Sequence, residues 1–112
     1  MLVKLFDPIA TDRRGEVPNG ALPWLTIPPL SWYAGRLTVF YQRQYIDSAQ
    51  RFEDAMRLTL THIEALDMCD ALANDPELHL GMQLQPGDMQ FVYNHAQLHD
   101  RTAFVDWPEP DK

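Results

Sequence analysis

The sequence predicts a fold made mainly of β-strands with one inserted α-helix. Short runs in which apolar and polar residues alternate predict the strands, and one longer run with apolar residues at helical spacing predicts the helix. Nine prolines and several turn dipeptides separate these runs, so each element is expected to be short. At 112 residues, the chain is long enough for one domain or part of one.

Residues 1–31 are expected to be irregular. Five of the nine prolines lie here, and Asn19-Gly20 is a turn dipeptide. Because proline lacks an N–H donor and ends helices, only short extended pieces fit between these residues. Met1 to Phe6 is expected to form an edge strand.

The first clear strand is predicted over Leu37 to Tyr41, directly after Gly35-Arg36. Its alternation places Phe40 and Tyr41 on opposite faces, and two large aromatic side chains there predict burial on both sides. Tyr45 to Phe52, which follows, is either a helical turn or a further extended piece.

One helix is predicted between Thr61 and Ala73. Thr61 and Glu64 have the spacing of a capping box, and apolar residues recur at steps of three and four. The helix is expected to end at Asn74-Asp75-Pro76, because a residue before proline is disfavoured in the α conformation.

Two further strands are predicted on either side of a turn. Leu78 to Leu84 alternates strictly, with its apolar residues expected on the core side. Pro86-Gly87-Asp88 is typical of a turn, and Asp88 is expected to bond backbone amides there. Met89 to Tyr93 contains aromatic and β-branched residues and is too short for a helix, which favours a strand.

The residues after this turn form a distinctive pattern. Asn94 ends the predicted strand, a histidine follows five positions later, and the segment then reads Arg-x-x-Phe with Thr after the Arg; the residues are Asn94, His99, Arg101, Thr102 and Phe104. The pattern, with its Pro-Gly-Asp turn, resembles the C-terminal signature of the TauD/TfdA family of iron(II)- and 2-oxoglutarate-dependent dioxygenases. The resemblance extends upstream through Trp32–Arg36 and Tyr45–Phe52, and it covers only the C-terminal part of a family domain.

This resemblance implies a fold and a function. The fold would be a partial double-stranded β-helix, the jelly roll of clavaminate synthase-like proteins. Residues 1–112 would form a single partial domain, with an irregular segment (1–31) and a strand–helix–strand–strand part (32–112) that carries the distal histidine. The implied function is oxidation of a small organic substrate, with iron(II) and 2-oxoglutarate as cofactors.

His99 is the residue that the resemblance identifies as a metal ligand. An iron site of this kind needs two histidines and one carboxylate on one face of the metal. The family's His-x-Asp pair has no counterpart in this sequence, and Arg101 comes too early to be the arginine that binds 2-oxoglutarate. Arg101 is instead expected to pair with Asp100 or Asp106. We therefore expect a chain that is incomplete and inactive alone, and whether it is an enzyme stays open.

The other histidines are not expected to bind metal. His62-Ile63-Glu64 has the His-x-acid spacing, but residues two apart on a helix do not face each other, so this pair is expected to be a solvated first turn. His95 is four positions before His99, about 13 Å along a strand, and is expected either to be packed in the fold or to lie beside the ligand. His79 is expected to be exposed.

Two further groups are expected to be structural. Cys69 lies on the apolar side of the predicted helix and is expected in the core. Four aromatic residues, three of them in a stretch without basic residues, are expected to pack hydrophobically rather than stack on a ligand or nucleic acid; they are Trp24, Trp32, Tyr33 and Trp107.

The charge balance restricts the partners. The net charge of −7 argues against nucleic acid and against an anionic membrane surface. A single cysteine and the absence of a signal-peptide pattern favour the cytoplasm. Two protein partners remain open, a chain that completes the barrel and a second copy of this one. The alternative function is a non-catalytic binding or oligomerisation module derived from the same fold.

Overall fold

The computed structural model describes residues 1–103, 105–106 and 108–109. The elements are η1 (Leu2–Phe6), β1 (Ile9–Asp12), β2 (Trp24–Ile27), β3 (Leu30–Tyr33), β4 (Arg36–Val39), α1 (Arg43–Ala49) and α2 (Leu60–Ala73). The described strands form two separate antiparallel pairs, β1–β2 and β3–β4. The short strands agree with the sequence prediction, but the structure has two α-helices where one was expected.

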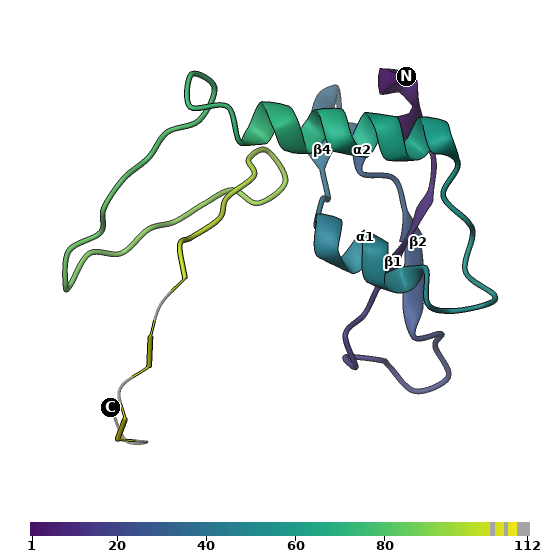
Figure 1. Cartoon of the computed structure of the whole chain (residues 1–112), viewed down its shortest axis with the longest axis horizontal. Coiled ribbons are helices and arrows are strands. Elements are labelled where there is room, and N and C mark those ends of the chain that lie inside the picture. The colour runs from purple at the N-terminus through teal and green to yellow at the C-terminus, as the bar shows by residue number, and fades with distance from the viewer. Residues whose placement is uncertain (104, 107, 110–112) are drawn as a thin grey trace.

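Strand β1 lies at the centre of the folded part. It pairs with β2 in a register that places Ile9 opposite Ile27 and Asp12 opposite Trp24, and α1 packs against it (Figure 1). All four residues of β1 are buried. A strand covered by a helix and by its partner strand buries its polar residues as well, so Asp12 needs internal partners.

Two apolar clusters hold these elements together. One joins η1, β1, α1 and α2, and its buried residues are Leu5, Ile9, Ile46, Ala65 and Leu66. The other is built on three alanines, Ala10, Ala49 and Ala55, against which Trp24 and Phe52 pack. The rings of Trp24 and Phe52 stack with centroids 5.3 Å apart, which confirms the packing expected for Trp24.

The N-terminal residues form a 3₁₀ helix, and the edge strand predicted over Met1–Phe6 is wrong. Lys4 N donates to Met1 O and Asp7 N donates to Lys4 O, the three-residue spacing of a 3₁₀ turn. Leu5 alone is buried in this helix. Because Leu5 is the one buried residue of the five, a single turn of 3₁₀ helix is enough to place its side chain in the core.

Strands β3 and β4 form a hairpin whose loop is Ala34-Gly35. Both loop residues have positive φ, +51° and +77°, as a type I′ turn requires. Across the hairpin, Ser31 Oγ and Thr38 Oγ1 share a hydrogen bond of 2.7 Å. The strand predicted at Leu37–Tyr41 is therefore present, as β4, but starts and ends earlier.

The burial expected around this hairpin is wrong. Trp32 is 68% exposed and Tyr33 is 77% exposed, while Phe40 is 42% exposed. The hairpin projects beside the core rather than through it, so neither of its faces is fully covered. Trp107 lies outside the described residues.

The segment left open by the sequence is helical at its start. Helix α1 presents Ile46 and Ala49, three residues apart, to the core. Arg43 Nε bonds Asp47 Oδ1 at 3.0 Å, an i, i+4 pair that stabilises one turn of helix.

Helix α2 ends where predicted, with Asn74 as its C-cap, but it begins earlier. Its N-cap is Thr59 rather than Thr61, and the third residue of the capping box is His62 rather than Glu64. Thr59 Oγ1 accepts from His62 N at 3.2 Å, and Thr59 N donates to His62 Nδ1 at 3.1 Å.

The described residues after α2 form neither helix nor strand. They leave the end of α2, extend away from the body and return toward it, as Figure 1 shows in green and yellow-green. The strands predicted at Leu78–Leu84 and Met89–Tyr93 are wrong for this structure, because a strand requires a hydrogen-bonded partner and neither has one here. Among the described residues, none of the helices is both long and apolar enough to span a membrane.

Candidate functional site

The segment that carries His99 is exposed. Asn94 to Ala103 lie on the surface without regular secondary structure, and both His95 and His99 are exposed. One backbone hydrogen bond, from Val39 N to His95 O at 2.8 Å, joins this segment to β4. His95 is exposed rather than packed in the fold, one of the two roles expected for it, and its ring meets Tyr93 edge-on with centroids 5.7 Å apart. A place for His95 beside the ligand stays a prediction.

The described residues do not form a complete iron site. No group of three or more histidine, cysteine, aspartate or glutamate side chains within them is close enough to hold a metal ion. His99 therefore has one imidazole to offer, and the donor set described here does not fit an iron(II) centre with three protein ligands. The assignment of His99 as a ligand stays a prediction.

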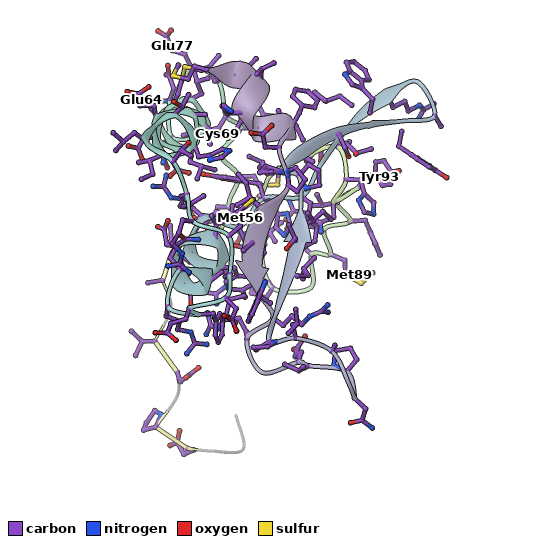
Figure 2. All side chains as sticks on the ribbon, turned by 90° about the vertical axis from the view of Figure 1, so that its right-hand side faces the viewer. Met56, Glu64, Cys69, Glu77, Met89 and Tyr93 are labelled. Atoms are coloured by element: carbon purple, nitrogen blue, oxygen red, sulfur yellow. The ribbon has the colours of Figure 1, made fainter. Side chains whose placement is uncertain are left out.

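A cavity of about 460 Å³ lies between the β3–β4 hairpin and the segment around His95. Tyr33, Arg36 and Tyr93 contribute to its lining, and Figure 2 shows Tyr93 on the side of the strands away from the helices. The Arg36 side chain has no ion-pair or hydrogen-bond partner among the described residues. The cavity thus combines one unpaired positive charge with two phenol rings.

A second cavity, of about 340 Å³, is lined almost wholly by apolar side chains from η1, α2 and the segment beyond it. Cys69 lies in this lining, on the side of α2 that faces η1 (Figure 2). Burial, with the nearby Asp70 carboxylate, raises the pKa of the Cys69 thiol. The core position expected for Cys69 is therefore only partly reached, and its thiol is held in the protonated, unreactive form.

His62 is buried, and the solvated first turn expected for it is wrong. Because Nδ1 accepts from Thr59 N, Nε2 carries the proton and donates to Asp7 Oδ2 at 2.9 Å. This bond, followed by the one from Lys4, lowers the pKa of the Asp7 carboxyl. His62 thus caps α2 and ties it to the end of η1, a structural role.

Asp12 is the most buried carboxylate described, with a side chain 1% exposed. Its oxygens accept from Ser48 Oγ at 2.5 Å, from Arg14 N at 2.8 Å and from Arg51 Nη2 at 3.0 Å. These bonds, that of Ser48 first, lower the pKa of Asp12. The sequence reasoning missed this network, since Asp12 stands among prolines and carries no local signal of burial.

Arg43 pairs with three carboxylates, of which Asp47 lies on α1 itself while Asp67 and Asp70 lie on α2 and join the two helices. Its guanidinium lies 3.0 Å from Asp47, 2.9 Å from Asp67 and 2.8 Å from Asp70. Although partial burial opposes the charged form, Asp47 and Asp67 raise the pKa of Arg43. Tyr41 also donates to Asp70, and burial together with this bond raises the pKa of its hydroxyl.

The residues next to His99 are arranged locally. Arg101 N donates to Asp100 Oδ1 at 2.8 Å, and Arg101 Nη1 donates to Thr102 O at 3.4 Å. Arg101 thus contacts Asp100 through its backbone amide, and the side-chain pairing expected with Asp100 or Asp106 stays a prediction. In the preceding turn, Asp88 Oδ2 accepts from Gln85 N at 2.8 Å, which confirms its predicted role, whereas Phe104 lies outside the described residues.

Comparison with known proteins finds a matching family and a similar protein. Residues 29–112 match the model of the taurine catabolism dioxygenase TauD, TfdA family. The chain belongs to the TauD/TfdA family. It is also 34% identical over 99 residues to FR-33289 synthase of Streptomyces rubellomurinus, a match that covers 85% of this chain. The family resemblance expected from the C-terminal pattern is confirmed.

The match covers little of the relative. The chain spans 28% of the length of FR-33289 synthase. The TauD/TfdA match begins at residue 29, so it includes β3, β4, both helices and the His99 segment. Short strands with two helices are consistent with part of a TauD-like fold.

Proposed function

We propose that this chain corresponds to the C-terminal portion of an iron(II)- and 2-oxoglutarate-dependent dioxygenase domain. In this proposal residues 1–112 form a single partial domain whose complete fold is a jelly roll, and His99 supplies one iron ligand. The other ligands and the arginine for 2-oxoglutarate come from family sequence that these 112 residues do not contain. The chain alone is then inactive, and the cytoplasm is its proposed location.

The TauD/TfdA match carries the proposal. The matched residues, 29–112, include His99 together with Asn94 and Arg101, whose spacing from His99 follows the family pattern. An exposed imidazole in the described structure supports it too, because a ligand that awaits further donors must remain accessible. The small organic substrate is part of the same proposal.

A chimera tests it directly. This chain would replace the matching segment of FR-33289 synthase, and the chimera would be titrated anaerobically with iron(II) and 2-oxoglutarate, with the intact relative as reference. We expect the weak visible charge-transfer band of the chelate in the chimera. We expect His99→Ala to abolish the band and His79→Ala, which alters another exposed histidine, to preserve it.

The outcomes separate clearly. A folded chimera without the band, or a band that survives His99→Ala, contradicts the assignment of His99. A band from the 112-residue chain alone contradicts the proposal that it is incomplete. Circular dichroism of each variant checks that the protein is folded.

The second candidate is a non-catalytic association module. One observation favours it: seven large apolar side chains between residues 78 and 93 are at least half exposed. Such a surface is typical of a contact with another polypeptide. In this candidate the partner is a chain that completes the barrel or a second copy of this chain.

A further inference from the structure

Residues 78–93, here called the arm, are held in place at three points. At its start, His79 Nδ1 donates to Ala73 O at the end of α2, at 3.3 Å. At its turn, Asp88 N donates to Gln85 O at 2.9 Å while the Asp88 carboxylate accepts from Gln85 N. Just beyond its end, His95 O accepts from β4. The arm is therefore a defined projection (Figure 1).

Between these points the backbone of the arm is unpaired. In the described part of the chain, residues 79–84 and 89–92 make no backbone–backbone hydrogen bond. The apolar side chains of the outgoing limb alternate and face solvent: Leu78 is 64%, Leu80 91%, Met82 63% and Leu84 50% exposed. Leu78 lies in a turn in which its N donates to Asp75 O, and His79 lies in a bend. Residues 80–84 follow with unused backbone donors and acceptors and an alternating apolar face, and such a segment pairs readily with another strand.

The outgoing limb is complementary to itself. Its seven residues, 78–84, are centred on Gly81. If two copies run antiparallel about a two-fold axis at Gly81, Leu80 lies opposite Met82; if the turn at Leu78 and the bend at His79 open on association, Leu78 also lies opposite Leu84 and His79 opposite Gln83. Every apolar residue then meets an apolar residue on one face, whereas a shift by one residue would move one strand's apolar set to the other face.

Charge does not oppose this contact. Each copy has a net charge of −7, so most of its surface repels a second copy. Residues 78–84 contain no aspartate, glutamate, lysine or arginine. The approach of two copies along this limb therefore brings no like charges face to face.

The returning limb would widen the contact. Met89 is 80%, Phe91 88% and Tyr93 64% exposed, again at alternate positions. Gln90 Nε2 already lies 3.2 Å from Met82 Sδ, so the two limbs are within side-chain reach. A two-stranded ribbon alone is marginally stable, and two limbs from each copy supply the strands that a stable sheet needs.

We infer that this chain forms a homodimer in which residues 78–84 of two copies pair as antiparallel strands centred on Gly81. The inference rests on the association module proposed above and names its partner, a second copy. It requires neither iron nor His99. The symmetric register is the observation that selects a second copy over an unrelated strand, because a two-fold interface must be complementary to itself.

Disulfide trapping tests the register. The Cα atoms of directly opposed residues lie about 4.5 to 5.5 Å apart in an antiparallel pair, within the range that a disulfide spans. Gly81→Cys, made with Cys69→Ala, fits the structure because an added Cβ at Gly81 meets no atom within 4 Å. We expect mild oxidation to convert most of this variant to a covalent dimer on a non-reducing gel.

Gln83→Cys, in the same Cys69→Ala background, is the matched control. It lies on the same face as Gly81, but the two copies of position 83 are about 13 Å apart in the inferred register, beyond disulfide reach. We expect this variant to remain largely uncrosslinked. Equal crosslinking at positions 81 and 83 would overturn the register.

Light scattering during size-exclusion chromatography tests the dimer itself. We expect the wild-type chain to have twice its mass of 13.0 kDa. Leu80→Lys, at a side chain that is 91% exposed, should halve this mass, while Val3→Lys, at an exposed apolar residue outside the arm, should not. A wild-type monomer at all concentrations overturns the inference, as does a dimer that Leu80→Lys leaves intact. The iron proposal is judged separately, by the chimera.

Discussion

Ser48 Oγ and Asp12 Oδ2 lie 2.5 Å apart, and their hydrogen bond joins α1 to the central strand β1. The Asp12 side chain is almost fully buried, so its charge requires hydrogen-bond donors directed at it. Arg14 N and Arg51 supply the remaining bonds. A carboxylate at the centre of the fold thereby fixes where α1 packs.

Replacing the Ser48 hydroxyl should weaken the whole fold. Ser48→Ala removes one hydrogen bond to a buried charge, and we expect the free energy of unfolding to fall by about 2 kcal/mol. Urea denaturation followed by circular dichroism measures this change. Asp54→Asn, at an exposed residue with no partner among those described, should change it by less than about 0.5 kcal/mol. Equal effects of the two substitutions would contradict the role of Ser48.

Stability should fall in acid. The pKa values of Asp7 and Asp12 are lower in the folded chain than in the unfolded chain, where the pKa of an aspartate is about 3.9. The stabilisation from both groups is therefore complete above that value and is lost as the pH falls through the lower, folded pKa values. Urea midpoints measured from neutral pH to strong acid should show this loss.

Asp12→Asn supplies the control for this pH dependence. The amide does not titrate, so the variant should be less stable at neutral pH and should lose less stability in acid than the wild type. A variant with the same acid dependence as the wild type would show that Asp12 does not cause it.

The link between the two helices should depend on Arg43. Arg43→Gln leaves Asp47, Asp67 and Asp70 close together without their shared cation, and we expect a loss of about 1 to 2 kcal/mol. The loss should shrink at about 1 M salt, where charges are screened within about 3 Å. Arg36→Gln, at a side chain without a described partner, should have little effect at either salt concentration. A loss that salt leaves unchanged would contradict the electrostatic explanation.

Replacing Ala34 by asparagine should stabilise the hairpin loop. Ala34 has φ +51°, a conformation that costs most L-residues about 1 kcal/mol and that asparagine tolerates better. Ala34→Asn creates the Asn-Gly pair typical of type I′ turns, and we expect the thermal midpoint to rise. Ala34→Val should lower it, because β-branched residues are strained at positive φ. A thermal midpoint that falls for Ala34→Asn and rises for Ala34→Val would mean that the loop has a different conformation.

The predictions from the sequence agree best with the structure where neighbouring residues determine the backbone conformation. The end of α2 at Asn74 follows from Pro76, and the turn at Gly87 follows from its Pro-Gly-Asp spelling. The start of α2 was misplaced by two residues because both Thr59 and Thr61 can cap a helix. The choice depended on His62, whose ring reaches back to Thr59.

The arm shows a different limit. Its alternation of apolar and polar residues was identified correctly, but alternation shows only that a segment suits a sheet. Whether a strand forms depends on a partner, and the described residues supply none to 79–84 or 89–92. The mistaken strands are thus the same residues for which we infer a second copy.

The sequence by itself determined the family, the turn at residues 85–88 and the end of α2, because each is written in neighbouring residues. The tertiary structure alone decided that Asp12 is buried, that His62 is bonded to Asp7 and that no three potential ligands meet among the described residues. The Ser48–Asp12 contact joins residues 36 positions apart, and the His62–Asp7 contact joins residues 55 apart. Such contacts depend on which distant segments of the chain come together on folding, and the spacing of neighbouring residues does not predict this.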